Sequence, residues 1–97
     1  MDALDVLVDE FPGEEAWSAF VEVFKSAWEN VSDKDHLIRE IGDEGIAIVL
    51  NARMGYDAIA WVKQPIGALE QKSVLQVLKA SPSGETAVKS LIMRMPV

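Results

Sequence analysis

The chain contains one histidine, and the segment around it is the first place to look for chemistry. His36 follows Asp33 and Asp35, and two carboxylates beside an imidazole could bind a metal ion. However, Leu37 and Ile38 occupy positions at which a calcium loop needs a ligand and a glycine. The two acids are better explained as residues of a first helical turn, where the helix dipole favours negative charge. We therefore expect no metal site here and a surface position for His36.

Catalytic arrangements are equally hard to build from this sequence. A Ser-His-Asp triad would combine His36 with a serine such as Ser73 or Ser90, and neither serine lies in a strand-turn-helix elbow. The acidic pairs at 14–15 and 43–44 are adjacent along the chain, so on a helix their carboxylates point in different directions. The glycines are scattered, without phosphate-binding spacing. The sequence predicts a protein that is not an enzyme and that uses no cofactor.

Length and composition indicate one folded domain. The chain has 97 residues, of which 49% are hydrophobic and 26% charged, well away from a disordered composition. It has no cysteine, so neither a disulfide framework nor a thiolate metal site can form. The first residues are acidic, unlike a secretory leader, and no apolar run approaches membrane-spanning length. We expect a cytoplasmic protein that makes no membrane contact.

Charge divides the chain into two parts. Residues 1–44 carry 13 acids against three bases, a net charge of −10, whereas residues 45–97 carry three acids against six bases, a net charge of +3. An acidic half repels phosphate, so nucleic acid is an unlikely partner. A helix-turn-helix around Gly42 would place Asp43 and Glu44 at the start of its recognition helix, which also disfavours DNA. The acidic half could steer a basic partner, or it could be an ordinary solvated surface.

Hydrophobic spacing predicts an all-α fold, a compact bundle of five to seven short helices. Helices are expected over residues 2–11 (capped by Asp2), 14–30 and 43–54, and another begins at Tyr56-Asp57 and runs through Val62. Three further helices are expected from their apolar residues: one with Leu37, Ile38 and Ile41, one with Val74, Leu75, Val77 and Leu78, and a last one with Ala87, Val88, Leu91, Ile92 and Met95. The 46–50 stretch, IAIVL, also suits a buried strand, but the pattern continues to Met54 and no second strand is available to pair with it. The strongest helix carries an apolar stripe that we assign to the core: Trp17, Phe20, Val21, Phe24, Ala27 and Trp28.

Caps and breakers set the limits of these helices. Pro12-Gly13 separates the first two helices, and Ser32 with Asp35 resembles a capping box for the third. Gly42 and Gly55 close the next two helices, and Pro65 stops the fifth. Residues 66–69 form an apolar connection that should lie against the core, and Ser73 caps the following helix. Residues 81–84, Ser-Pro-Ser-Gly, read as a turn.

One stretch carries a family resemblance. In order along the chain it shows Gly55, Ala58, Trp61, Pro65, Ala68-Leu69, Val74-Leu75-x-Val77-Leu78, Gly84, Ala87-Val88, Leu91 and Arg94. This pattern, over about residues 55–95, resembles the toxin-binding domain of the Xre/MbcA/ParS antitoxin family. Two positions depart from the family. Glu70-Gln71 stands where the family usually has Gly-Gly, and Ser73-Val74 stands where it has Thr-Pro or Ser-Pro.

The resemblance implies a non-catalytic protein-interaction module, with a RES-type or similar toxin as partner and with homodimerisation. The residues expected to border the partner are Trp61, Lys63, Gln64, Leu69, Lys72, Arg94 and Met95. For Trp61 and Leu69, core packing is the competing interpretation. Two other functions stay open. One is a structural protein that forms a homo-oligomer, and the other is a helical ligand-binding domain with a pocket at Arg53, Tyr56 and Asp57.

Overall fold

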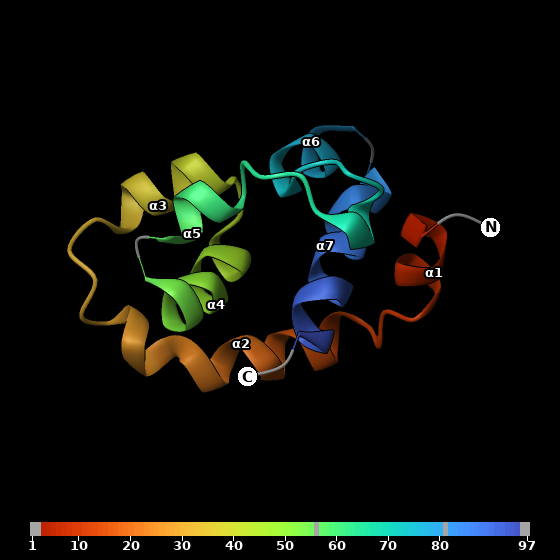
Figure 1. Ribbon diagram of the computed structural model, residues 1–97. Coiled ribbons are helices and arrows are strands. Elements are labelled where there is room, and N and C mark those ends of the chain that lie inside the picture. The colour runs from red at the N-terminus through yellow and green to blue at the C-terminus, as the bar shows by residue number, and fades with distance from the viewer. Residues whose placement is uncertain (1–2, 56, 81, 96–97) are drawn as a thin grey trace.

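The computed structural model describes residues 3–55, 57–80 and 82–95. In these ranges the chain forms seven α-helices and one 3₁₀ turn, and no β-strand (Figure 1). The elements are α1 (Ala3–Asp9), α2 (Glu14–Trp28), α3 (Lys34–Ile41), α4 (Glu44–Met54), α5 (Asp57–Trp61), η1 (Gly67–Leu69), α6 (Val74–Ala80) and α7 (Pro82–Arg94). The all-α prediction is confirmed. The radius of gyration is 12.7 Å, close to the roughly 13 Å expected of a compact chain of this length.

Helix α4 lies at the centre of one end of the bundle. Five successive residues, Ile46 to Leu50, are at most 3% exposed, so the central part of α4 is buried on every side. A helix that is apolar all round is stable in water only when other elements cover it completely. Its ends are closed by Asp43, whose Oδ1 accepts a hydrogen bond from the Ile46 N–H at 2.9 Å, and by Gly55. The helical interpretation of IAIVL is therefore correct.

Helix α2 crosses α4 and supplies the large side chains of the core. Trp17, Val21 and Trp28 are buried, and Phe20 and Phe24 pack against them from partly exposed positions. Ala27, predicted to share this stripe, is exposed. The reason is geometric, because Ala27 lies about 100° around the helix from Trp28 and falls beyond the edge of the covered face.

Helix α7 packs against both α6 and α1, so the first and last helices of the chain lie side by side (Figure 1). The acidic and basic halves of the sequence are consequently interleaved, with α1 on α7 and α2 on α4. No helix among the described residues is long and apolar enough to cross a membrane.

The prediction of a turn at 81–84 is wrong for residues 82–84, the part of it that the structure describes. Residues 82–84 already belong to α7, because proline fits a first helical position, where its missing N–H costs no hydrogen bond. Ser81 lies outside the described residues. Gly84 has a packing role: a Cβ there would stand 2.0 Å from the Val77 carbonyl oxygen of α6. Glycine is therefore what allows α6 and α7 to approach so closely.

Other boundaries follow the predicted signals, with corrections to one cap and to several helix ends. Gly42 ends α3 in the left-handed conformation, with φ of 97°, as expected. The capping box at Ser32 does not form, because Asp33 is the N-cap residue and its side chain makes no capping bond. Ser73 does cap α6, and the box is reciprocal with Gln76 at 3.2 and 2.8 Å. The first helix ends at residue 9, the second at 28 and the fifth at 61, and the predicted cap Asp2 is not among the described residues.

The contact at Gly84 gives a direct test of the α6–α7 packing. We expect Gly84→Ala to destabilise the protein by at least about 3 kcal/mol, because the helices must separate to relieve the clash with the Val77 carbonyl. Gly67→Ala is the matched control, since its Cβ would meet only the Gln71 amide at 3.6 Å. Urea unfolding followed by circular dichroism measures both. Equal midpoints for the two variants would contradict the packing.

Candidate functional site

Four of the seven predicted partner-binding residues lie on the connection between α5 and α6, which we call the 62–73 loop. Trp61 immediately precedes it, as the last residue of α5. The loop is fixed by apolar side chains that enter the core, because Val62 and Leu69 are 0% exposed. A further bond ties its ends together, since the Leu75 N–H donates to the Val62 carbonyl at 3.2 Å. The loop is therefore held at both ends.

The backbone of the loop closes on itself. The Ile66 N–H donates to the Lys72 carbonyl at 3.1 Å, and the Gln71 N–H donates to the Ile66 carbonyl at 3.0 Å. Closing so tightly requires two successive left-handed residues, Glu70 with φ of 58° and Gln71 with φ of 66°. They are the only non-glycine residues with positive φ in the described parts of the chain. Each costs on the order of 1–2 kcal/mol relative to an ordinary helical or extended conformation.

The outer side of the loop is polar. Lys63, Gln64, Glu70, Gln71 and Lys72 are all exposed there. The Lys63 ammonium lies 3.8 Å from a carboxylate oxygen of Glu40 on α3, a loose ion pair in which both side chains are more than a third exposed. Pairs of this kind contribute little to stability, so Lys63 can exchange its partner at small cost. The outer side thus presents cationic, anionic and amide side chains on a loop whose backbone is held in place.

The structure separates the predicted residues into different roles. The Leu69 side chain is wholly in the core and leaves no surface for a partner, which decides the alternative in favour of packing. Trp61 is partly buried against the core. Met95 lies at the far end of α7, where its carbonyl accepts a hydrogen bond from Arg53 Nη1 at 3.2 Å. Lys63, Gln64 and Lys72 remain as exposed candidates on the loop itself.

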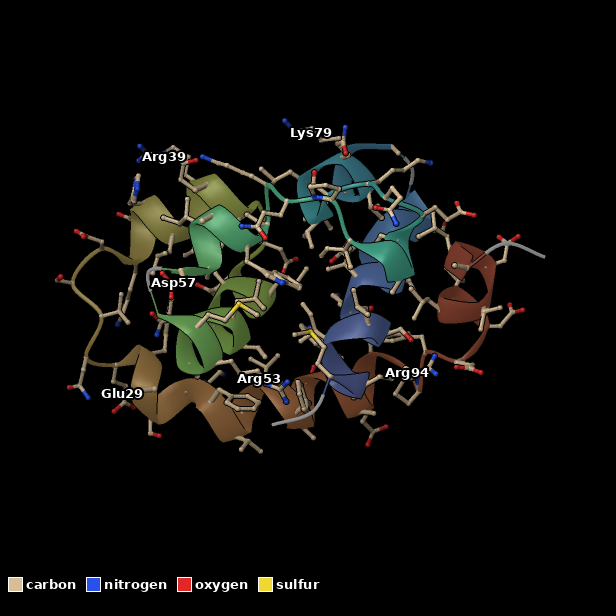
Figure 2. The ribbon with its side chains drawn as sticks, in the orientation of Figure 1. Glu29, Arg39, Arg53, Asp57, Lys79 and Arg94 are labelled. Atoms are coloured by element: carbon tan, nitrogen blue, oxygen red, sulfur yellow. The ribbon has the colours of Figure 1, made fainter. Side chains whose placement is uncertain are left out.

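Arg94 has a different neighbourhood. Its guanidinium forms an ion pair with Glu10, which follows α1 (Figure 2). It also lines an apolar groove of about 440 Å³ between α1, η1 and α7, together with Ala3, Val6, Leu7, Ala68 and Leu91. Val6 is one of two large apolar side chains in the described residues that stand clearly exposed. Sequence reasoning did not find this groove, because it depends on helices from opposite ends of the chain.

A buried cation that the sequence did not single out joins three helices. Only 8% of the Lys89 side chain is exposed, and its ammonium lies 2.9 Å from Glu85 and 3.3 Å from Glu14. The ammonium also stands over the Trp17 ring at 5.5 Å from the centroid. Asp43, the cap of α4, interacts with Glu85 from the opposite side. This set of residues, the Lys89 cluster, connects the N-terminal ends of α2 and α4 to α7.

The charged groups of the Lys89 cluster shift one another's pKa values. Burial alone would lower the pKa of Lys89, but hydrogen bonds and ion pairs with Glu85 and Glu14 raise it above its ordinary 10.5. The hydrogen bond from Lys89 lowers the pKa of Glu85, whereas burial raises the pKa of Asp43. Glu85 is thus engaged by Lys89 of the same helix, whereas Asp43 caps α4 through the Ile46 N–H. The cluster is best explained as a structural connection.

Of the pocket considered at residues 53, 56 and 57, the structure describes Arg53 and Asp57. The Arg53 guanidinium lies over the rings of Phe20 and Phe24, at 5.6 Å from each centroid, and so faces α2 (Figure 2). Asp57 is exposed at the start of α5, and Tyr56 lies outside the described residues. Arg53 therefore serves to join α4, α2 and the end of α7.

His36 is exposed, in the position expected for a surface residue. Within the described ranges, the histidine and carboxylate side chains form no group of three or more suited to a metal ion. Compared with known proteins, the chain matches no family model, no curated protein and no solved structure. The structure and the sequence pattern themselves must carry the functional argument.

The left-handed pair in the 62–73 loop predicts a stabilising change. Replacing Glu70 or Gln71 by glycine should raise the free energy of unfolding by about 0.5–1 kcal/mol each, because glycine adopts positive φ without steric cost. Lys72→Gly is the control, since Lys72 pairs with Ile66 in extended conformation and glycine there only adds unfolded-state entropy. Chemical denaturation should show a higher free energy of unfolding for the two glycine variants at 70 and 71 and a lower one for Lys72→Gly. A loss of stability in all three variants would contradict the assignment of strain to residues 70 and 71.

The raised pKa of Lys89 predicts a loss of stability in alkali. A cation with a raised pKa in the folded state stabilises the protein fully below 10.5 and loses that contribution as pH rises above it. Lys89→Met should cost about 1–3 kcal/mol at neutral pH and should flatten the alkaline part of the stability curve. The exposed Lys79→Met variant is the control. Thermal unfolding against pH measures all three proteins, and an unchanged alkaline slope in Lys89→Met would contradict the assignment.

Proposed function

We propose that the chain is a non-catalytic protein-interaction module of the antitoxin type, which contacts its partner through the outer side of the 62–73 loop. The observation that carries the proposal is the backbone at residues 70 and 71. The resembled family has Gly-Gly at these two positions, and here the backbone adopts there the left-handed conformation that glycine favours. The conformation at residues 70 and 71 is thus one that a Gly-Gly pair would adopt readily, which supports the resemblance.

The location of strain also supports a binding role. Two adjacent left-handed residues persist only because the surrounding hydrogen bonds and the buried Leu69 hold them. Such strain is frequent where a loop must present side chains in one fixed arrangement. Lys63, Gln64 and Lys72 lie on the same loop and lose little on exchanging solvent for a partner. A rigid loop also avoids part of the ordering cost of association.

Covering a partner is the mechanism that this surface supports. A RES-type toxin is the proposed partner, since that is the class of protein that the resembled family binds. Complex formation would bury the loop and, through it, the neighbouring end of α5. We also propose that the module acts without chemistry of its own, by occupying surface that the toxin needs.

Co-expression tests the proposal. The tagged chain is co-expressed with a RES-type toxin, and growth rescue and co-purification are measured. We expect the wild type to rescue growth and to bind, and Lys63→Glu with Gln64→Ala to weaken binding at least tenfold. Lys79→Glu makes the same charge change at an exposed lysine of α6 and should bind as the wild type does. Equal binding by all three proteins would reject the loop as the contact surface. Absence of any complex would reject a RES-type toxin as the partner.

A further inference from the structure

Helix α1 is short and packs through one side on α7 and η1. It has seven residues, and of these only Leu7 is buried in the described structure. Leu4 and Val8 are partly buried on the same side, whereas Val6 is 36% exposed. An isolated helix of this length is unstable in water, so α1 exists because of the surface under it. That surface, which we call the α1 platform, consists of η1, Lys72 and the adjacent faces of α6 and α7.

The α1 platform is larger than the helix that covers it. On one side of α1 lies the apolar groove of about 440 Å³ described above, whose floor includes Ala68 and Leu91. On the other side a pocket of about 50 Å³ remains between α1 and the α6–α7 pair, near Val77 and Ala87. Well-packed protein interfaces leave few voids larger than a water molecule. The platform therefore has apolar surface that α1 leaves uncovered on both flanks.

Charge on the two surfaces is complementary. Glu10, just after α1, pairs with Arg94 of the platform, and Asp5 of α1 shares the smaller pocket with Lys72. The chain as a whole has a net charge of −7, so a platform cation that pairs with an acid beside α1 runs against the average charge of the chain. The platform is thus suited to a short amphipathic helix with an acidic side chain at the edge of its apolar stripe.

We propose that the α1 platform is a docking site for an acidic amphipathic helix supplied by a partner protein, and that α1 is its intramolecular competitor. The partner helix would place apolar residues at the spacing of Leu4, Leu7 and Val8, and a carboxylate against Arg94. A longer helix would also fill the groove that α1 leaves open. This inference goes beyond the proposed function, because it concerns a separate surface and stands whether or not the outer side of the 62–73 loop binds a toxin.

Competition sets how tightly the partner must bind. A short tether gives α1 an effective concentration on the order of millimolar at its own platform. A free helix with identical contacts therefore binds the wild-type chain poorly, and any change that weakens α1 without altering the platform must strengthen binding of that helix. This relation separates an exchangeable helix from one that is simply part of the core.

Fluorescence anisotropy with a labelled synthetic peptide of residues 1–12 tests the proposal on the full-length chain. Leu7→Ala in the chain removes the anchor of α1 and leaves the platform intact. We expect it to bind the peptide at least tenfold more tightly than the wild type does. The same peptide carrying Leu7→Ala is the matched control and should not bind. Circular dichroism checks that the variant is folded, and Glu10→Arg, a surface change, provides a second way to release α1 if it is not.

A charge reversal identifies the site. Arg94→Glu, added to Leu7→Ala, should weaken peptide binding several-fold, and a peptide carrying Glu10→Arg should restore it. Three results would overturn the proposal: no binding to any folded variant, binding that does not depend on the peptide's Leu7, or binding that is insensitive to Arg94. Sedimentation analysis adds a fourth, since a wild-type dimer that exchanges α1 between copies would make the second copy the occupant.

Discussion

Burial on every side of the central part of α4, Ile46 to Leu50, is the constraint from which the arrangement of the other helices follows. Ile46 to Leu50 present apolar side chains in every direction, so no single neighbouring layer could cover them. Helices α2, α3 and α5 each contact α4, from different positions along the chain (Figure 1). The short α3 and α5 are too small to be stable alone, and their existence depends on the area that α4 offers. A surface helix in place of α4 would leave them without support.

Charged side chains then attach α7 to α2 and α4. Helix α7 shares little apolar contact with α2, and the Lys89 cluster and Arg53 join the two. Each cation combines an ionic or hydrogen-bonding partner with an aromatic face, Lys89 over Trp17 and Arg53 over Phe20 and Phe24. An ammonium or guanidinium can be held in a partly dry position only when such contacts replace its lost hydration. The aromatic stripe of α2 therefore acts both as core and as a support for cations.

The sequence predicted most of the fold because its signals were local. Gly42 and Gly55 end helices through their own backbone freedom, and the capping box at Ser73 involves residues three apart. The failures involve contacts between distant segments. Gly84 resembled a turn glycine, yet the carbonyl of Val77 in another helix explains it. Lys89 was not singled out, because nothing in its neighbourhood along the chain indicates Glu14 or Trp17.

The two candidate surfaces differ in the same way, because one is formed by neighbouring residues and the other by distant segments. The 62–73 loop lies within the stretch that carries the family resemblance, but the sequence did not predict the left-handed backbone at Glu70 and Gln71. The α1 platform could not be found in this way, since it combines an N-terminal helix, a central 3₁₀ turn and a C-terminal helix. Its cation Arg94 meets the acidic Glu10 only on folding. The net charges of the two sequence halves, −10 and +3, thus have a physical counterpart, because α1 of the acidic half packs on α7 of the basic half.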